Sequence, residues 1–299
     1  MRLLAIFGPT AVGKTAVAIA TAELLRARGE DPVAISCDSI QVYRGLEVLS
    51  GAANETEREQ LEHRLLSFVD VREEYSAGRF AEQAQPLIDG LLEEGRRPIL
   101  VGGTGLYLRA AVSELELRPP VAPEIRAAVA SEASERGLEA LHAEIEPAAA
   151  AGIAPGDRTR ILRAVELQRA GHAPAPAHEQ GGELWTARPR HPTLLAGLTM
   201  DREELERRIS ERVDRMLADG AGEEAKAAVA AGASRTARAA LGFAALLAGD
   251  AEAVKTAHRR FARRQLTWMR RMEGVTLINR TGRSDADVAD ELVAQLQDA

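Results

Sequence analysis

The sequence holds a single cysteine, Cys37, among 299 residues. One cysteine excludes an internal disulfide and any zinc site built from several thiolates, and it is typical of a reducing compartment. No apolar run approaches the roughly 20 residues that span a bilayer. The first motif begins at Gly8, which leaves little room for a signal or transit peptide before it. We therefore expect a soluble cytoplasmic protein without a membrane anchor.

Aromatic residues are also scarce, at 3% of the chain, although the apolar fraction of 45% is ordinary for a globular protein. The formal net charge of −7 argues against a nucleic-acid partner if the charge is spread evenly. It is not spread evenly. Residues 255–271 carry seven basic side chains and no acidic one, whereas acidic residues gather in 55–62 and 285–298. A local basic surface for RNA is therefore compatible with the composition.

The strongest motif is GPTAVGKT at residues 8–15, which matches the phosphate-loop (P-loop) pattern G-x-x-x-x-G-K-[ST]. An apolar segment, residues 3–7, precedes it as a predicted strand, and residues 14–28 follow with the pattern of a helix. In this context backbone N–H groups and the helix dipole bind a di- or triphosphate. Lys14 is predicted to reach terminal phosphate oxygens, and Thr15 to ligate Mg²⁺. The predicted diphosphate-binding residues are Gly8, Pro9, Thr10, Ala11, Val12, Gly13, Lys14 and Thr15.

Two more apolar segments predict buried strands, residues 32–37 and 98–101. The first delivers Asp38 and Ser39 at its carboxyl end, and the second delivers a glycine-rich turn with Thr104. Ligands of open parallel sheets bind outside the carboxyl ends of the strands, so these side chains are expected to share one site with the P-loop. The glycines alone would equally suit a tight turn between strand and helix.

The chain is long enough for one large α/β core with an additional lobe. We predict a P-loop NTPase-like parallel sheet flanked by helices, with an inserted helical subdomain. The core would comprise residues 1–116 and 192–299, and the insertion residues 117–191. Helical stretches are predicted at residues 124–136 and 158–170, between linkers rich in proline and glycine at 118–123 and 171–192.

After the insertion, residues 193–199 are predicted to resume the sheet as a strand. Asp201 and Glu204 have the spacing of a capping box, which predicts a helix that runs to Leu217.

The P-loop does not by itself tell whether the phosphate is transferred, hydrolysed or expelled. A kinase or NTPase would need a second acidic strand end for Mg²⁺, and Asp38 could supply it. However, the run DSIQVYRG from Asp38 carries Gln41, Tyr43 and Arg44, which a Mg²⁺ ligand does not require. From the residues alone, Asp38 is a metal ligand, a helix cap or a general base.

Six blocks together carry a family resemblance. They are GPTAVGKT at 8–15, DSIQVYRG at 38–45, EYSAGRF at 74–80, PILVGGTGLY at 98–107, GDRTRILRAVE at 156–166 and RRQLTWMR at 263–270. Their order and spacing resemble those of bacterial tRNA dimethylallyltransferases, and the resemblance runs from Gly8 to about Arg271. It implies transfer of a dimethylallyl group from dimethylallyl diphosphate to N6 of adenine 37 in the anticodon stem-loop of tRNA, with Mg²⁺, by a monomer.

In that reaction the P-loop would hold the leaving group, pyrophosphate. N–H groups, Lys14 and Mg²⁺ would neutralise the negative charge that grows on it. The resemblance makes Asp38 the general base, sets Thr104 near the reacting centre and directs Arg259 to the diphosphate. The implied catalytic residues are thus Asp38, Thr104, Lys14 and Arg259. Residues implied to face tRNA are Asp38, Ser39, Ile40, Gln41, Thr104, Arg126, Thr159, Arg160, Ile161, Leu162 and Arg163, with the region 241–243.

The basic stretch 255–271 has Arg260, Arg264 and Arg271 on one helical face, with Phe261 and Trp268 on another. A solvated helix packed on its apolar side would look the same. Seven cations without an acid favour RNA phosphate as the counterpart, and Arg264 is added to the predicted tRNA-binding set. The target adenine would have to be flipped out of its stack to reach a buried diphosphate.

Two segments depart from the family pattern. Residues 48–54 (VLSGAAN) lack the lysine and proline of the usual Gly-Thr-Ala-Lys-Pro continuation, so a contact there is either lost or supplied by another segment. Residues 239–243 (AALGF) lack a glutamine amide and a tyrosine hydroxyl. Three alternatives remain: an adenylate isopentenyltransferase that acts on free nucleotide, a P-loop small-molecule kinase, and an RNA-binding protein with a vestigial nucleotide site.

Overall fold

A computed structural model describes residues 2–115, 118–172 and 188–297 of the chain. The chain divides into two compact units: unit 1 is Met1–Glu114 with Arg188–Ala299, and unit 2 is Leu115–Ala187. Leu117, where the insertion was predicted to begin, and most of the second predicted linker lie outside the described residues.

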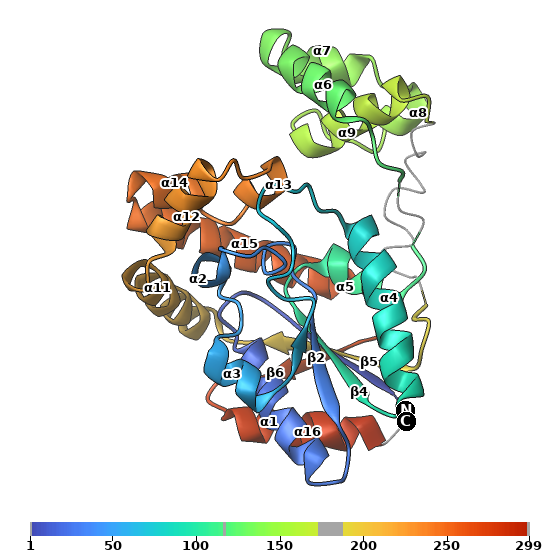
Figure 1. Cartoon of the computed structure of the whole chain (residues 1–299). Coiled ribbons are helices and arrows are strands. Elements are labelled where there is room, and N and C mark those ends of the chain that lie inside the picture. The colour runs from blue at the N-terminus through green and yellow to red at the C-terminus, as the bar shows by residue number, and fades with distance from the viewer. Residues whose placement is uncertain (1, 116–117, 173–187, 298–299) are drawn as a thin grey trace. The chain divides into compact units, whose positions relative to one another are not determined.

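Unit 1 is built on a parallel sheet (Figure 1). Its described strands follow the order β3-β2-β4-β1-β5-β6. Both faces of the central strands are covered, which explains why they read as continuous apolar runs. The predicted parallel α/β sheet is therefore confirmed. The strands are β1 Leu3–Phe7, β2 Pro32–Ser36, β3 His63–Arg64, β4 Arg97–Gly102, β5 Thr193–Thr199 and β6 Val275–Asn279.

Helices cover the sheet on both faces. On one face α1 (Lys14–Arg26) and α16 (Asp285–Gln297) pack side by side and bury side chains such as Val17 and Leu292 against the strands (Figure 1). On the other face α4 (Ala77–Glu93) and α5 (Gly105–Val112) pack against each other and against β4. Since α1 starts directly after β1 and the P-loop, its N-terminus points to the carboxyl edge of the sheet.

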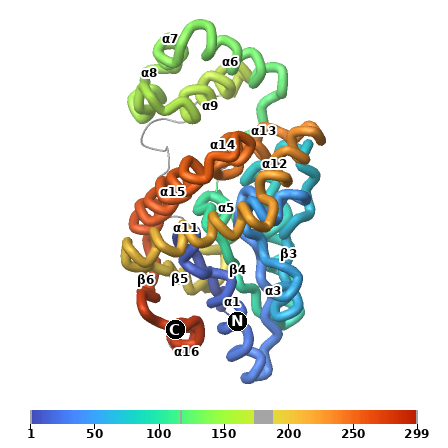
Figure 2. Tube along the Cα trace, turned by 90° about the vertical axis from the view of Figure 1, so that its left-hand side faces the viewer, coloured from blue at the N-terminus to red at the C-terminus, as the bar shows by residue number. Residues whose placement is uncertain are grey.

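Two long helices close that edge. Helix α11 (Arg202–Ala218) packs along α15 (Ala251–Arg271), and α15 also contacts α5 (Figure 2). The remaining helices of unit 1 are short: α2 Glu47–Ser50, α3 Glu55–Gln60, α12 Ala221–Ala230, α13 Arg235–Arg238 and α14 Phe243–Ala248.

The predicted capping box at the start of α11 is wrong. Asp201 occupies the N-cap position, but its side chain makes no capping hydrogen bond. The carboxylate of Glu204 instead pairs with the guanidinium of Arg208 at 3.0 Å and accepts a hydrogen bond from the backbone N–H of Gly282 at 3.4 Å. The carboxylate of Glu204 is thus engaged by Arg208, one turn later in the helix, and by the turn after β6. It is therefore not bonded to the N-cap backbone, as a capping box requires.

The chain leaves unit 1 after α5 and returns before β5 at one place. Ser113 forms an isolated antiparallel bridge with Pro189, and the N–H of Arg190 donates to the carbonyl of Val112 at 2.7 Å. The guanidinium of Arg190 pairs with Asp89 of α4 at 2.9 Å. The two crossings therefore lie side by side and are fixed to the same helix.

Unit 2 has its own small apolar core, formed by residues such as Val129, Leu141 and Ile161. On its surface Arg169 pairs with the carboxylates of Glu132 and Glu144. None of the helices in the described ranges of either unit is long and apolar enough to cross a membrane. The described helices of unit 2 are α6 Pro123–Glu135, α7 Leu138–Ala143, α8 Pro147–Ala150 and α9 Arg158–Arg169, of which α6 and α9 correspond to the two predicted helical stretches.

Candidate active site

The P-loop connects β1 to α1 through backbone conformations that need glycine. Gly13, the N-cap of α1, has a left-handed φ of 92°. Gly8 lies so close to the neighbouring strand β5 that a Cβ on Gly8 would come within 2.6 Å of the Leu198 carbonyl oxygen. The loop is thus held tightly against the sheet, and the N-terminus of α1 opens into a cavity.

That cavity, which we call the polar cavity, has a volume of about 320 Å³. It is bounded by the P-loop, the segment after β2, the turn after β4, and helices α11 and α15. The structure brings together here most of the side chains predicted to bind diphosphate or to act on the substrate. These lining residues are Thr10, Ala11, Gly13, Lys14, Thr15, Asp38, Ser39, Ile40, Gln41, Thr104 and Arg264.

Lys14 is turned toward its own loop. Its Nζ donates to the carbonyl oxygens of Gly8 at 3.2 Å and Pro9 at 3.0 Å. Burial and the neighbouring positive charge of Arg212 lower the pKa of Lys14 to about 8, while the negative charge of Asp38 acts in the opposite direction. An anion in this cavity would favour the charged form of Lys14 and relieve part of that desolvation.

Asp38 is fixed by the segment that follows it. Its Oδ1 accepts hydrogen bonds from the backbone N–H of Ile40 at 3.0 Å and of Gln41 at 3.5 Å. The Oγ1 of Thr104 accepts the N–H of Ser39 at 3.3 Å, which links this segment to the turn after β4. The two polar strand ends predicted to converge are therefore joined by a direct hydrogen bond.

Arg212 of α11 also lines the polar cavity, and sequence reasoning missed it. Its Nη2 donates to the carbonyl oxygen of Ser50 at 3.1 Å, and a Cβ on Gly51 would come within 1.9 Å of the same atom. Burial lowers the pKa of its guanidinium. Arg212 thus brings a cation to segment 48–54, where the family lysine is absent. That absence was the one signal that could have prompted a search for a substitute.

The segment that receives Arg212 is itself held by a half-buried acid. Both carboxylate oxygens of Glu224 on α12 accept backbone hydrogen bonds, from Val48 at 3.0 Å and from Leu49 at 2.7 Å. These N–H groups lie in the first turn of α2, which otherwise lacks a side-chain cap. Glu224 therefore fixes the position of Gly51 opposite Arg212.

The structure does not bring Arg259 into the polar cavity. Its Nη2 donates to Ser210 of α11 at 3.2 Å. The adjacent residue, His258, lines the cavity instead and is only 3% exposed. Burial, and secondly the charge of Arg212, lower the pKa of His258 to about 4, so the imidazole is neutral at neutral pH. Successive side chains on a helix point about 100° apart. His258 therefore faces the polar cavity, whereas Arg259 faces α11.

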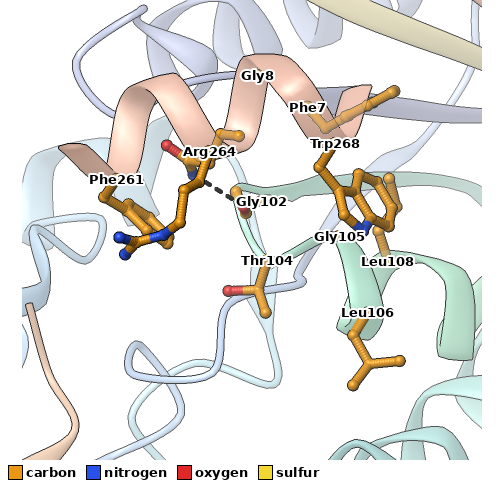
Figure 3. Close-up of a pocket in the computed structure, with 12 residues that line it drawn as sticks. Phe7, Gly8, Gly102, Thr104, Gly105, Leu106, Leu108, Phe261, Arg264 and Trp268 are labelled. Carbon is orange, nitrogen blue, oxygen red and sulfur yellow. Dashed lines mark hydrogen bonds between the residues drawn. The ribbon is translucent and has the colours of Figure 1, made fainter. Parts of the chain in front are cut away.

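A second cavity of about 190 Å³ shares the turn after β4 with the first (Figure 3). We call it the apolar cavity, because Phe7, Leu108 and Trp268 form much of its wall. The rings of Phe7 and Trp268 meet edge to face, with centroids 6.4 Å apart. Gly105 has no room for a side chain, since a Cβ would lie 2.3 Å from the indole. Thr104 lines both cavities and marks their junction.

Gln265 of α15 ties the walls of the two cavities together. Its Oε1 accepts the N–H of Thr10 in the P-loop at 2.8 Å, and its Nε2 donates to the carbonyl of Gly103 at 2.8 Å. Gln265 is nearly buried, at 9% exposed. It belongs to the block RRQLTWMR, and its side chain fixes the distance between the P-loop and the turn after β4.

The basic stretch 255–271 forms most of α15, and part of its charge is neutralised by α11. Lys255 pairs with Asp214 at 2.8 Å, and Arg263 pairs with Glu206 at 3.4 Å. Arg264, by contrast, lies over the ring of Phe261, 5.4 Å from its centroid, and lines both cavities (Figure 3). The sequence pattern could not show these acids, because they come from another helix.

The region 241–243, also predicted to face tRNA, lies in unit 1, and its Leu241 lines the polar cavity. The remaining residues of that prediction lie in unit 2. Thr159 and Arg160 are exposed on α9, and Arg160 pairs with Asp157 at 2.5 Å. Ile161 is fully buried in the core of unit 2, so its side chain is not available to a ligand there. The whole predicted group in this unit is Arg126, Thr159, Arg160, Ile161, Leu162 and Arg163.

The polar cavity has few protein ligands for a metal. No cluster of three or more His, Cys, Asp or Glu side chains that could hold a metal exists among the described residues. Mg²⁺ usually keeps several waters and binds through one or two protein oxygens together with substrate phosphates. A cavity with Thr15 and Asp38 beside a phosphate loop fits that pattern.

These features define a P-loop protein of the α/β class, whose site joins an anion-binding cavity to an apolar one. The model of the IPP transferase family matches residues 41–272. The chain is 41% identical over 295 residues to the tRNA dimethylallyltransferase of Anaeromyxobacter dehalogenans, covering 93% of this chain and 95% of that protein. The corresponding enzyme of Acetivibrio thermocellus is 38% identical, covering 93% and 91%.

A solved structure is also similar to this chain. The tRNA isopentenylpyrophosphate transferase of Bacillus halodurans matches with a TM-score of 0.69 at 31% identity, over 99% of this chain and 97% of that one. The chain belongs to the IPP transferase family.

Proposed function

We propose that this protein transfers a dimethylallyl group from dimethylallyl diphosphate to N6 of adenine 37 in tRNA and releases diphosphate. The observation that carries the proposal is the junction of the polar and apolar cavities at Thr104, beside Asp38. A prenyl diphosphate has one anionic end and one apolar end, and its reactive carbon lies between them. The two cavities offer complementary surroundings to these two ends.

The diphosphate end fits the polar cavity. The N-terminus of α1, Lys14 and Arg212 surround the space with N–H groups and positive charge. Diphosphate leaves an allylic carbon with a growing negative charge, which such groups stabilise without any transfer of phosphate. Thr15 would hold Mg²⁺ together with diphosphate oxygens, and the ion would supply further charge neutralisation.

The five-carbon end fits the apolar cavity. An apolar cavity of about 150 Å³ accepts benzene, a molecule of six carbons. The apolar cavity here, at about 190 Å³, therefore has the size for a dimethylallyl group but little room for a second isoprene unit. Trp268 closes this space against Gly105.

Asp38 is the base that this proposal requires. The exocyclic amine of adenine is a poor nucleophile because its lone pair is delocalised, so removal of a proton as the C–N bond forms accelerates the reaction. Asp38 lies in the polar cavity close to Thr104, where the reactive carbon would lie. Hydrogen bonds to its Oδ1 hold the carboxylate in place.

The tRNA would approach along α15. Arg264 is exposed at the junction of the cavities, and the exposed Arg260 lies one turn before it. A flipped adenine would enter the polar cavity while phosphates of the anticodon stem-loop contact these arginines. We further propose that Thr159 and Arg160 of unit 2 contact the same RNA, and that the protein acts as a monomer in the cytoplasm.

One experiment tests donor, acceptor and position together. Nucleosides from tRNA of cells with and without this protein would be compared by mass, and adenosine carrying one dimethylallyl group at position 37 is expected only in the presence of the protein. In a companion assay, purified protein receives labelled dimethylallyl diphosphate with either tRNA or AMP. Label in AMP but not in tRNA, or hydrolysis of ATP with unmodified tRNA, would overturn the proposal.

A further inference from the structure

Arg280 follows β6 and contacts the P-loop, but it does not line the polar cavity. It is 4% exposed, and the family-model match ends before it, at residue 272. Its backbone N–H donates to the carbonyl of Thr199 at the end of β5, at 3.0 Å. The hydrogen bond to β5 therefore fixes the backbone of Arg280 beside the sheet and places its guanidinium against the P-loop. The segment that carries Arg280 has no phosphate-binding motif.

The contacts of Arg280 with the loop are specific. Its Nη1 donates to the carbonyl oxygens of Val12 at 2.6 Å and Gly13 at 3.1 Å. Its Nη2 pairs with Asp285, at the start of α16, at 2.5 Å. A Cβ on Gly13 would come within 1.9 Å of Nη1. The guanidinium thus occupies the space beside the Gly13 backbone that any other residue at this position would fill.

Peptide geometry gives these contacts a consequence on the other side of the loop. In a planar trans peptide the C=O and the N–H point in opposite directions. A donor on the carbonyl of Val12 therefore fixes the direction of the Gly13 N–H. The carbonyl of Gly13 also accepts the N–H of Val17 at 3.1 Å within α1, so the helix itself orients the next peptide and Arg280 adds a second donor there. Gly13 and Lys14 line the polar cavity. Hydrogen bonds in series also polarise one another, which strengthens the N–H donors.

We propose that Arg280 is a positioning residue of the diphosphate site, which holds the peptide Val12–Gly13 with its N–H group toward the polar cavity. The inference rests on the proposed function only in that the ligand is a diphosphate. Its effect falls on binding of the diphosphate group, whatever the group is attached to. Arg280 itself touches no substrate.

The test measures the affinity of the whole protein for inorganic pyrophosphate with Mg²⁺ by calorimetry. Arg280→Met keeps the bulk of the side chain but removes the donors, and we expect the Kd to rise roughly tenfold to a hundredfold. Arg280→Lys keeps one donor group and is expected to restore part of the affinity. Thermal unfolding of each variant gives the folded fraction used to correct the Kd.

Arg283→Met is the matched control. Arg283 lies on the same turn and bonds the carbonyl of Asn279 at 3.1 Å and the carboxylate of Glu291 at 2.6 Å, but it does not touch the P-loop. It is expected to lower the melting temperature and leave the corrected Kd unchanged. A merely structural role of Arg280 would give the same pattern for Arg280→Met, and that result would overturn the inference.

Two outcomes keep the inference separate from the proposed function. If Arg280→Met does not fold, Arg280→Gln decides, because its shorter uncharged amide cannot reach both carbonyls and Asp285; native pyrophosphate affinity in that variant refutes the positioning role. If the native protein fails to prenylate tRNA but loses pyrophosphate affinity in the Arg280 variants, the proposed function fails and the role of Arg280 stands.

Discussion

The polar and apolar cavities share the turn at Thr104, yet they are built by different means. In the polar cavity, burial lowers the pKa values of Lys14 and Arg212, so the site holds cations that a bound anion would stabilise. In the apolar cavity, Trp268 and Gly105 set the boundary by shape. Under the proposed function, the head of the prenyl diphosphate would therefore be selected by charge and its tail by volume. Each selection can therefore be changed without the other.

The largest effect is expected at the junction of the two cavities. Asp38→Ala should lower the turnover number by roughly 10² to 10⁴ while tRNA binding stays the same, because a general base is lost. Asp38→Asn is the matched variant: it retains an oxygen for the N–H of Ile40 and should lose as much activity. Turnover that is unchanged in single-turnover assays would remove Asp38 from the mechanism.

The second largest effect is expected when a positive charge is removed from the polar cavity. Arg212→Met should raise the KM for dimethylallyl diphosphate by about 10- to 100-fold, the range for loss of a charged hydrogen-bond partner. Arg215→Met, an exposed arginine on the same helix, serves as the control and should leave the KM near its native value. Equal KM values in the two variants would show that Arg212 does not bind the diphosphate.

The pKa of Lys14, lowered to about 8, predicts a pH dependence. Above that pH the free enzyme loses the ammonium charge, whereas the bound anion holds it, so binding requires uptake of a proton. The KM for dimethylallyl diphosphate should then rise by up to about tenfold per pH unit above pH 8. Lys14→Arg cannot lose its charge in this range and should give a flat profile. A flat profile in the native enzyme would contradict the prediction.

The volume of the apolar cavity is tested with a longer donor. Trp268→Ala should raise kcat/KM for geranyl diphosphate relative to dimethylallyl diphosphate by roughly tenfold or more, because one bulky wall is removed. This truncation also costs about 3–5 kcal/mol of stability in a packed site, so the ratio of the two donors on one sample is the readout. Trp268→Phe should change the ratio less. An unchanged ratio in both variants would place the tail elsewhere.

The smallest effect concerns RNA. Arg264→Ala should weaken tRNA binding and reduce the slope of log K against log salt by about one, as for one lost phosphate contact. Arg263→Ala is the neighbouring control, since Arg263 already pairs with Glu206. Identical slopes for both variants would mean that Arg264 is a solvated charge at the rim of the cavities.

The P-loop and its strands could be predicted from sequence because their determinants are local. Residues 3–7 and 193–199 form β1 and β5 with the predicted bounds, since apolar runs between turn residues define buried strands. Helix α1 ends at Arg26 rather than at residue 28, because the chain turns back at Gly29 with a φ of 82°. Asp38 and Thr104 reached one site by the general rule for strand ends in parallel sheets.

The rest of the site depends on packing between distant segments. Arg212 and His258 line the polar cavity only because α11 and α15 close the carboxyl edge of the sheet. In the sequence, both residues look like ordinary polar positions of amphipathic helices. The same packing gives Lys255 and Arg263 acidic partners from α11, which a reading of α15 alone could not supply. The roles of Arg259 and of the unit 2 residues stay predictions.

The paired crossings at Ser113 and Pro189 bear on how this protein could be rebuilt. Both ends of residues 115–187 start from adjacent points on unit 1, and Arg190 with Asp89 fixes those points to α4. A short turn could therefore bridge the gap without disturbing any pairing in the sheet. The helical insertion could therefore be exchanged as a module, and unit 1 could carry a different helical element grafted at the same two points.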